Sequence, residues 1–267
     1  MTAKEALQFA ISQLKQANIA TYHIDALIIT KIALSISEVK LLTHPEIKLT
    51  DEQKKRLFDL IEKRKKFYPM AYITKHKEFY GFDFYVDERV LIPRPETELL
   101  VEETIKIAKT LPNPTIVDVG TGSGCIAITL SKLLGIHVIG LDISKDAIDV
   151  AKINKSRLKA KVSFAVGDKL TAIKKADIIV SNPPYITKQE YEKLSKDVKF
   201  EPRLALIDKN PNQFLKELIE QAKNKTHYLI VELGYNQSDF VRSFKECIDV
   251  KKDLNGIERV AIFNFDR

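Results

Sequence analysis

The stretch "TIVDVGTGSG", residues Thr115 to Gly124, runs from an apolar segment into a glycine-rich turn. The apolar segment predicts a buried strand, and the residues from about Gly124 onward predict a helix. Glycines at 120, 122 and 124 let the backbone turn tightly and approach a ligand closely. Their G-x-G-x-G spacing differs from the G-x-G-x-x-G that seats a pyrophosphate, and by itself it also fits an ordinary strand-to-helix turn.

Strand and helix patterns alternate on both sides of this turn. Further strands are predicted at "HVIGLD", "VSFAVGD", "ADIIVSN", "HYLIVELG" and "ERVAIFNF". Helices are predicted over "PRPETELLVEETIKIAKTL", "SKDAIDVAKINKSRL", "QFLKELIEQAKN" and "SDFVRSFKECI". Apolar strands that alternate with helices indicate an α/β fold with a doubly wound, mainly parallel sheet.

The first seventy residues have a different pattern, which predicts a small helical bundle. Three capping-box patterns precede apolar residues at helical spacing. The three boxes are Thr2 with Glu5, Ser35 with Glu38, and Thr50 with Gln53. From about Tyr68 the chain becomes rich in Phe, Tyr and Val around Gly81, which predicts a β-hairpin or an extended connector.

Composition limits the class of protein. The chain has 267 residues, 45% of them hydrophobic and 30% charged, as in soluble globular proteins. It has no apolar run long enough for a transmembrane helix, and its amphipathic N-terminus lacks a signal-peptide pattern, so a cytoplasmic protein is predicted. The net charge of +7 permits an acidic partner but does not require one, because the lysines are spread along the chain. The scattered His and Cys residues predict no metal site.

Two acidic residues follow strands near the glycine-rich turn. Asp142 lies 22 residues after Gly120, where an acidic side chain suits the hydroxyls of a ribose. Asp168 ends the next strand, where a carboxylate can accept a hydrogen bond from an adenine amino group. Each alone is more often a strand terminus or a helix cap, but together they predict an adenosine pocket. The glycine spacing then favours S-adenosylmethionine over a dinucleotide, because this ligand has no phosphate to bind.

The stretch "SNPPY", residues 181–185, follows another predicted strand and suits methyl transfer to a planar NH2 group. Such a nitrogen is a poor nucleophile, so a site must hold both N–H bonds and aim the lone pair. The Asn182 side-chain oxygen and the Pro183 carbonyl provide two acceptors, the two prolines stiffen the loop, and Tyr185 offers a flat face. This pattern does not choose between a glutamine amide and the amino group of a nucleic-acid base.

Motifs along nearly the whole chain resemble one enzyme family. These motifs are "LIPRPETE", "DVGTGSG", "LDIS", "SNPPYI", "EPRLAL", "ELGYNQ" and "DLNGIERV". In these motifs and their order the chain resembles the peptide chain release factor N5-glutamine methyltransferases. The resemblance implies methylation of the glutamine amide in the Gly-Gly-Gln motif of class 1 release factors, with S-adenosyl-L-methionine as donor and S-adenosyl-L-homocysteine as product.

The resemblance also implies a domain plan. Residues 1–70 would form an N-terminal helical substrate-binding domain, and residues 71–90 a β-hairpin linker. Residues 91–267 would form a Rossmann-like, class I S-adenosylmethionine-dependent methyltransferase domain with a seven-stranded mixed sheet. The expected partner is the release factor, with no membrane and no nucleic acid required, and the expected state is a monomer.

Carried over position by position, the resemblance implies two sets of site residues. The set that binds the cofactor is Gly120, Thr121, Gly122, Ser123, Gly124, Asp142, Ile143, Asp168, Lys169, Asn182, Arg94 and Pro95. The catalytic set, which also holds the substrate glutamine, is Asn182, Pro183, Pro184 and Tyr185. Glu96 and Thr97 are expected beside Arg94 and Pro95 at the mouth of the cofactor pocket. Lys169 departs from the family, which often has an aromatic residue at that position.

Three alternatives stay open at this point. The acceptor can be a glutamine of a ribosomal protein, or the amino group of a nucleic-acid base. Against DNA, the N-terminal region has no stripe of Arg and aromatic residues and carries acidic residues throughout. The third alternative is a non-catalytic binding protein that keeps the fold, against which the intact Asn182, Tyr185 and glycine-rich turn argue.

Overall fold

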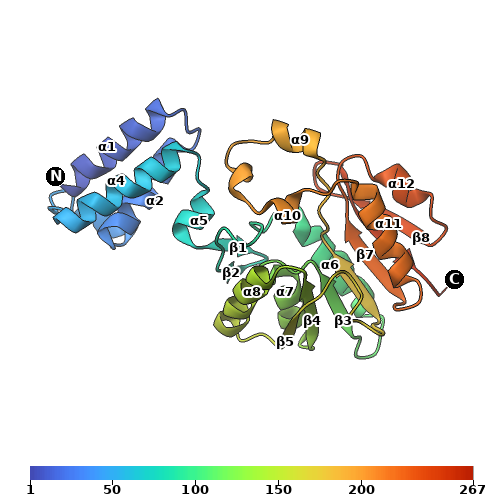
Figure 1. Ribbon diagram of the computed structural model, residues 1–267. Coiled ribbons are helices and arrows are strands. Elements are labelled where there is room, and N and C mark those ends of the chain that lie inside the picture. The colour runs from blue at the N-terminus through green and yellow to red at the C-terminus, as the bar shows by residue number, and fades with distance from the viewer. Residues whose placement is uncertain (267) are drawn as a thin grey trace. The chain divides into compact units, whose positions relative to one another are not determined.

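The computed structural model describes residues 1–266 and divides into two compact units (Figure 1). The helical unit comprises Met1–Lys75 together with Ser195–Phe200. The sheet unit comprises residues 76–194 and 201–266. Every residue that the sequence predicts to bind the cofactor or the acceptor lies in the sheet unit.

The helical unit contains five α-helices. They are α1 (Ala3–Gln16), α2 (Tyr22–Leu34), α3 (Glu38–Thr43), α4 (Asp51–Lys65) and α5 (Met70–Thr74). Small alanines and Leu14 make the buried face of α1, and Leu57 and Ile61 make that of α4. The helical character predicted for this region is confirmed.

Two of the three predicted capping boxes are present, at Thr2 before α1 and at Thr50 before α4. The third prediction was wrong, because Ser37 caps α3 instead of Ser35. Ser35 ends α2: it has a left-handed φ of +55°, and its N–H donates to the carbonyl of Ile32. A residue that closes one helix in this way cannot also begin the next.

The sheet unit begins with the hairpin of β1 (Lys77–Phe79) and β2 (Phe82–Phe84), which pair antiparallel. Gly81, with a φ of +76°, forms its turn together with Tyr80, whose φ is also positive. The N–H of Tyr80 donates to a carboxylate oxygen of Glu98 over 2.8 Å, which fixes the turn to the first turn of α6 (Thr97–Ala108).

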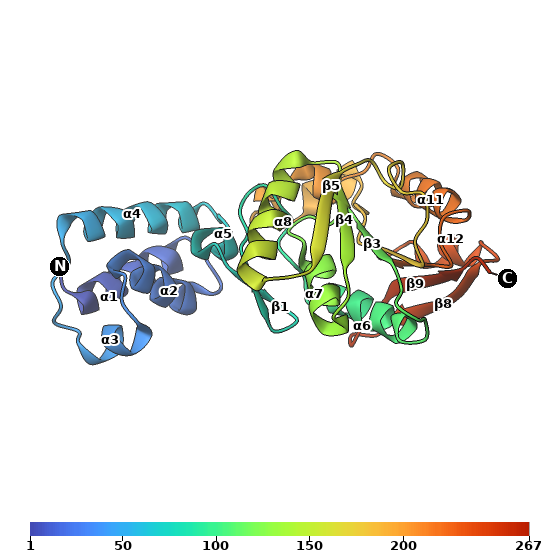
Figure 2. The same ribbon diagram turned by 90° about the horizontal axis from the view of Figure 1, so that it is seen from below.

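A seven-stranded mixed sheet forms the centre of this unit (Figures 1 and 2). The strands are β3 (Ile116–Val119), β4 (Val138–Asp142), β5 (Val162–Val166), β6 (Ile178–Ser181), β7 (Tyr228–Glu232), β8 (Cys247–Lys252) and β9 (Glu258–Asn264). Their order across the sheet is β5-β4-β3-β6-β7-β9-β8, and all pairs are parallel except β7 with β9 and β8 with β9. The predicted α/β class and the seven-stranded mixed sheet are confirmed.

Helices cover both faces of the sheet, because successive strand residues point to opposite sides. The helices not yet named are α7 (Cys125–Leu134), α8 (Lys145–Leu158), α9 (Lys188–Lys193), α10 (Arg203–Leu206), α11 (Pro211–Ala222) and α12 (Ser238–Arg242). Ile116 and Ile178 share one core with α6 and α7, whereas Val117 and Ile179 share another with α11.

The helix predicted over residues 238–248 was wrong in its second half. Helix α12 ends at Arg242, and Cys247 begins strand β8, which pairs antiparallel with β9. The local pattern of "SDFVRSFKECI" suits a helix, but β9 offers a free sheet edge to its last residues. Pairing with a strand that lies later in the sequence therefore overrides local helical preference.

Candidate active site

The reversal in strand order places two loops next to each other at the carboxyl edge of the sheet. Strand β3 pairs with β4 on one side and β6 on the other, and Val119 is level with Ser181. The glycine loop, residues 120–124, follows β3, and the N-P-P-Y loop, residues 181–185, starts at Ser181, the last residue of β6. In open α/β sheets ligands bind at such a reversal.

Gly120 brings the two loops into close approach. A Cβ atom built on Gly120 would lie 3.8 Å from the main-chain oxygen of Asn182. Gly120, Gly122 and Gly124 all have left-handed φ values, of +74°, +54° and +82°. A side chain at any of them would strain the backbone, which explains the three glycines of the sequence pattern.

The glycine loop is fixed to strand β4 by main-chain hydrogen bonds. The N–H groups of Gly120 and Thr121 both donate to the carbonyl of Leu141, over 2.8 and 2.9 Å. The N–H of Gly122 donates to Oδ2 of Asp142 over 2.9 Å. This part of the site is therefore built chiefly from the backbone of two adjacent strand ends.

Asp118 lies inside this arrangement and is fully buried. Its Oδ2 accepts from the Thr121 hydroxyl over 2.6 Å and from the N–H of Ala127, whereas Oδ1 has no hydrogen-bond partner among residues 1–266. Burial raises the pKa of Asp118 to about 7, and its two hydrogen bonds oppose that shift. The carboxyl group holds the glycine loop to the start of α7.

Asp142 lies at the end of β4, where a ribose is expected. Its Oδ1 accepts from the N–H of Ser144 and its Oδ2 from the N–H of Gly122, each over 2.9 Å. Burial raises the pKa of Asp142, and these main-chain hydrogen bonds oppose the shift. Each carboxylate oxygen keeps a second lone pair, so Asp142 can still accept from a ligand hydroxyl. Ile143, its neighbour, is exposed.

Asp168 and Lys169 follow strand β5, the third strand of this half of the sheet. The Asp168 side chain is exposed, and its Oδ1 lies 3.8 Å from Lys169 Nζ. The same Nζ lies 3.0 Å from Glu217 Oε2 and 4.6 Å from the ring centroid of Phe214, both on α11. The structure thus brings the glycine loop, Asp142 and Asn182 together, while the Lys169 head group lies against α11.

The N-P-P-Y loop is held by side chains from distant parts of the sequence. Ser181 Oγ donates to the carbonyl of Val119 over 2.8 Å, and Asn182 Nδ2 donates to Thr97 Oγ1 over 3.1 Å. The second contact leaves Oδ1 of Asn182 available as an acceptor. Pro183 is buried and Pro184 half-buried.

Tyr185, the last residue of this loop, packs on strand β7 and the turn after it. A Cβ atom on Gly234 would lie only 3.0 Å from Cβ of Tyr185, so a glycine is needed for this packing. The Tyr185 hydroxyl lies 3.4 Å from Oε1 of the buried Glu232. Burial and then the charge of Glu232 raise the pKa of Tyr185 well above its usual range.

The "LIPRPETE" segment is tied to the "EPRLAL" segment through Glu201. The buried Glu201 carboxylate accepts from the N–H of Ile92 over 2.9 Å and from the guanidinium of Arg94 over 2.5 Å. Arg94 therefore has a structural partner in addition to any ligand it meets. Pro95 and Glu96 follow it and lead into α6 at Thr97.

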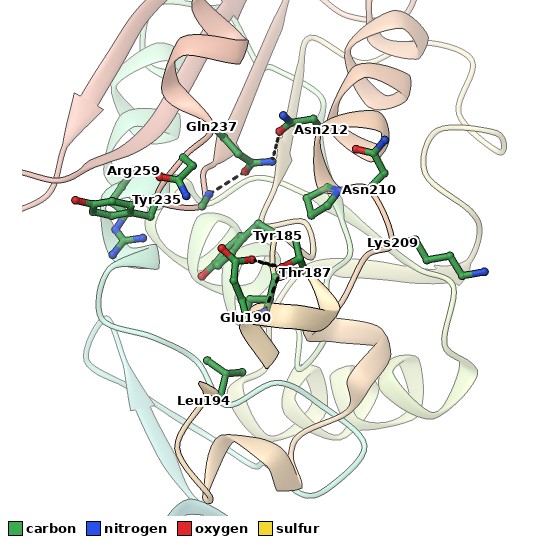
Figure 3. A pocket seen from close by; sticks show the side chains of 14 residues that line it. Tyr185, Thr187, Glu190, Leu194, Lys209, Asn210, Asn212, Tyr235, Gln237 and Arg259 are labelled. Carbon is green, nitrogen blue, oxygen red and sulfur yellow. Dashed lines mark hydrogen bonds between the residues drawn. The ribbon is translucent and has the colours of Figure 1, made fainter. Parts of the chain in front are cut away.

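A cavity of about 460 Å³ opens beside Tyr185, on the part of the loop that leads into α9 (Figure 3). Its lining combines polar side chains with a larger share of apolar surface. The lining residues are Tyr185, Ile186, Thr187, Glu190, Leu194, Lys209, Asn210, Pro211, Asn212, Gly234, Tyr235, Asn236, Gln237 and Arg259. Gln237 Nε2 donates to Asn212 Oδ1 over 3.2 Å, which ties the turn after β7 to the start of α11.

Sequence reasoning placed Thr97 only at the mouth of the pocket and gave no role to Glu201, Glu232 or Gly234. Each lies in a motif of the sequence, so the motifs pointed to the right segments. The contacts themselves join residues far apart in the chain, such as Thr97 and Asn182, and no local sequence pattern predicts them. Within residues 1–266 there is no cluster of side chains suited to a metal ion.

Comparison with known protein families matches both parts of the chain. The model described as "PrmC N-terminal domain" matches residues 5–74, and the model described as "Methyltransferase domain" matches residues 111–259. In the part of the chain that the structure describes, no helix has the length and apolar character to cross a bilayer.

Curated relatives match over nearly the full length. The release factor glutamine methyltransferase of Koribacter versatilis (strain Ellin345) is 38% identical, with 98% of each chain covered. The enzyme of the same name from Clostridium acetobutylicum is 37% identical, again with 98% of each chain covered. That from Bacillus subtilis (strain 168) is 37% identical over 97% of this chain and 96% of its own.

Solved structures share the fold at low sequence identity. The catalytic domain of hMettl16, solved in complex with MAT2A 3'UTR hairpin 6, superposes with a TM-score of 0.58 at 16% identity, over 82% of this chain and 84% of its own. A methyltransferase from Pyrococcus furiosus gives a TM-score of 0.51 at 17% identity, over 73% and 93%. These likenesses support a methyltransferase fold.

Proposed function

The chain belongs to the release factor glutamine methyltransferase family, and from this premise we propose its reaction. It transfers a methyl group from S-adenosylmethionine to the side-chain amide nitrogen (N5) of the glutamine in the Gly-Gly-Gln motif of class 1 peptide chain release factors. The proposal rests most on the close approach of the two loops, since a Cβ atom built on Gly120 would lie 3.8 Å from the main-chain oxygen of Asn182. A donor on the glycine loop and an acceptor on Asn182 would thus be neighbours.

The described residues fit the donor. The glycine loop carries no side chain at three positions where the backbone has positive φ, so a ligand can approach its main chain. Asp142 keeps lone pairs for the ribose hydroxyls, and the exposed Asp168 is available to the adenine amino group. When bound, S-adenosylmethionine supplies an activated methyl group on a sulfonium.

The N-P-P-Y loop would prepare the acceptor. Asn182 Oδ1 and the Pro183 carbonyl accept the two N–H groups of the glutamine amide, which holds the nitrogen and directs its lone pair. Asn182 is already oriented for this by its hydrogen bond to Thr97. Tyr185 covers one face of the planar amide. No strong base is needed, because the nitrogen becomes acidic once it is methylated and releases its proton to water.

The rest of the plan follows the family. We assign residues 1–70 to gripping the release factor, residues 71–90 to a hairpin linker and residues 91–267 to methyl transfer. We further propose a cytoplasmic monomer that needs no nucleic acid for the reaction. The cavity beside Tyr185, whose lining combines polar side chains with apolar surface, lies next to the acceptor position and is consistent with a polypeptide acceptor.

A radiolabelled methyl-transfer assay with a panel of acceptors tests the proposal. The panel holds a purified class 1 release factor, the same factor with its Gly-Gly-Gln glutamine replaced by alanine, a ribosomal protein mixture and unmethylated DNA. Label on the intact factor alone supports the proposal. Label only on ribosomal protein or only on DNA would overturn the acceptor while leaving methyl transfer in place. Absence of label with S-adenosylmethionine bound would favour a binding protein.

A further inference from the structure

Glu232, at the end of β7, is a buried acid that the reaction described above does not use. Its exposed fraction is 1%, and β7 lies next to β6, with Val231 level with Ser181. A carboxyl group is costly to bury without partners. Nevertheless, Oε2 of Glu232 has no hydrogen-bond partner among residues 1–266. A buried acid left in this state directly under the N-P-P-Y loop requires an explanation.

Glu232 contacts the loop at its Tyr185 end. The Tyr185 hydroxyl lies 3.4 Å from Oε1 of Glu232, a long hydrogen bond in which the phenol donates. Gly234 leaves room for Tyr185, because a Cβ atom on residue 234 would lie 3.0 to 3.2 Å from the Cβ and ring atoms of Tyr185. Hydrogen bonds at reacting sites are often long before the substrate binds.

Glu232 also acts on the Asn182 end, through Thr97. Thr97 is buried at the start of α6, and its hydroxyl lies near enough to the Glu232 carboxyl to oppose the rise in the pKa of that group. The same hydroxyl oxygen accepts from Asn182 Nδ2 over 3.1 Å. The Thr97 hydroxyl has only one proton to donate. If Glu232 accepts this proton, Thr97 can only accept a hydrogen bond from Asn182, and otherwise Thr97 can donate to Asn182.

We propose that Glu232 is a positioning residue that sets the direction of these hydrogen bonds, an inference that rests on the proposed methyl transfer to a glutamine amide. As a carboxylate, Glu232 takes the protons of Thr97 and Tyr185. The Thr97 oxygen then accepts from Asn182 Nδ2, which turns Asn182 Oδ1 toward the acceptor. As a carboxylic acid, Glu232 can donate to the Thr97 oxygen. Thr97 then donates its own proton to Asn182 Oδ1. The Asn182 side chain therefore presents Nδ2, instead of Oδ1, to the acceptor.

The surroundings of Glu232 place this change within the neutral pH range. Burial raises the pKa of Glu232 to about 7, and Thr97, the charge of Arg259 and Tyr185 oppose the shift. The charged and titratable groups that face it are Arg259 on β9, Glu96 before α6, Tyr185 on the loop and the Cys125 thiol on α7. Burial raises the pKa values of the Cys125 thiol and the Tyr185 hydroxyl well above their ordinary ones, so among the groups around it Glu232 is expected to titrate near pH 7.

The pH dependence of the single-turnover rate tests the inference. Rates are measured from pH 5.5 to 9 with saturating S-adenosylmethionine and release factor. In the wild type, log rate should rise with unit slope and level off above about pH 7. Glu232→Gln should lose that inflection, and its plateau rate should fall by roughly 10- to 100-fold, as expected when an acceptor is misplaced.

A control variant and a conservative variant distinguish a positioning role of Glu232 from a contribution to stability alone. Glu103→Gln removes another buried acid of the same unit, one that pairs with Lys106, and should keep the wild-type profile. Thr97→Ser, which keeps the hydroxyl, should retain the rate and the inflection. Thr97→Val should behave as Glu232→Gln does, and the double variant should be no slower, because both changes break one chain of contacts. An unchanged rate and inflection in Glu232→Gln would overturn the inference.

A readout without turnover distinguishes failure of this inference from failure of the proposed function. With S-adenosylhomocysteine bound, the side-chain amide signal of Asn182 in a nitrogen-proton NMR spectrum should shift with a midpoint near pH 7. That shift should be absent in Glu232→Gln and present in Glu103→Gln. If the wild type does not methylate the release factor but the Asn182 signal titrates, the acceptor is wrong and the positioning role stands. A signal that does not move contradicts the role of Glu232, whatever the acceptor.

Discussion

The glycine loop and the N-P-P-Y loop leave the same edge of one sheet, but different kinds of contact hold them. The glycine loop is fixed by main-chain N–H groups that bond to the end of the neighbouring strand β4. The N-P-P-Y loop is fixed by side chains: Asn182 by Thr97, and Tyr185 by Glu232, while Gly234 leaves room for Tyr185 because it has no side chain. A site that must bind a ligand can rely on its backbone, whereas a site that must aim a reacting group depends on side chains held from several elements.

This contrast separates the effects expected from substitutions. Changes at the glycine loop should weaken cofactor binding and lower stability. Changes at the N-P-P-Y loop should chiefly slow transfer and should alter cofactor affinity much less.

The largest effect is expected for Asn182→Ala. This change removes the side-chain acceptor for the glutamine amide, and loss of one preorganised hydrogen-bonding group costs about 100- to 1,000-fold in rate. Asn182 is also expected among the cofactor-binding residues, so the dissociation constant of S-adenosylmethionine should rise, but by far less than the rate falls. Single-turnover kinetics combined with calorimetry measure both quantities, and a large loss of cofactor affinity would show that the two loops do not act separately.

The next effect is expected for Gly234→Ala. Gly234 does not have a positive φ, so the added methyl group acts mainly by pushing the Tyr185 ring, whose Cβ it would meet at 3.0 Å. A small displacement of a positioning group can cost up to about 100-fold. The rate with release factor should fall while calorimetry shows intact cofactor binding. If the rate holds, Tyr185 is not needed where it lies.

Gly124→Ala and Gly135→Ala compare a glycine that has close neighbours with one that has open space around it. Both positions have left-handed φ, +82° and +71°, so both variants should lose about 1–2 kcal/mol of unfolding free energy. At Gly124 a Cβ atom would also meet Phe164 at 3.0 Å, whereas at Gly135 nothing lies within 4 Å. Overpacking should add about 1–3 kcal/mol to the loss in Gly124→Ala. Denaturant unfolding measures the difference, and equal losses would argue against tight packing at Gly124.

Each loop covers one buried acid, which makes stability depend on pH. Burial raises the pKa of both Asp118 and Glu232 to about 7, from ordinary values of 3.8 and 4.5. Between those values and about 7, the folded state keeps protons that the unfolded state has released, so the unfolding free energy falls as pH rises. Thermal unfolding at pH 5 and pH 8 should show this fall in the wild type and a smaller one in Glu232→Gln. A wild-type melting temperature that rises over this interval would contradict both pKa shifts.

The smallest effect is expected for Lys169→Ala. The Lys169 head group is only 13% exposed, and it pairs with Glu217 and lies over the Phe214 ring on α11. Because these contacts hold Lys169, its loss should change cofactor affinity by less than about fivefold, as for a weak charge pair. A larger loss in a calorimetric titration would indicate that Lys169 turns to the adenine when the ligand binds.

The same contrast explains how much the sequence alone could predict. The glycine loop follows from a local pattern, because three glycines after an apolar strand predict a tight turn. The structure shows positive φ values at all three glycines. The alternation of strands and helices likewise predicted the sheet. Strand β8 was missed because its pairing partner β9 comes later in the chain and overrides a helical pattern.

The contacts of the N-P-P-Y loop could not be predicted in the same way. Thr97 and Glu232 lie 85 and 50 residues from Asn182 in the sequence. They meet it because α6 covers the sheet and β7 pairs with β6. Only the fold brings such residues together, and for this reason the sequence predicted neither the contact of Thr97 with Asn182 nor a role for Glu232.

The most direct test of the central claim is to locate the transferred methyl group. Wild-type protein, S-adenosylmethionine and a class 1 release factor are incubated, and tandem mass spectrometry of the digested factor identifies the modified atom. We predict one methyl group on the side-chain amide nitrogen of the Gly-Gly-Gln glutamine, and none when the Asn182→Ala variant is used. A methyl group on another residue, or an unchanged yield with Asn182→Ala, would contradict the view that the N-P-P-Y loop holds a glutamine amide beside the donor.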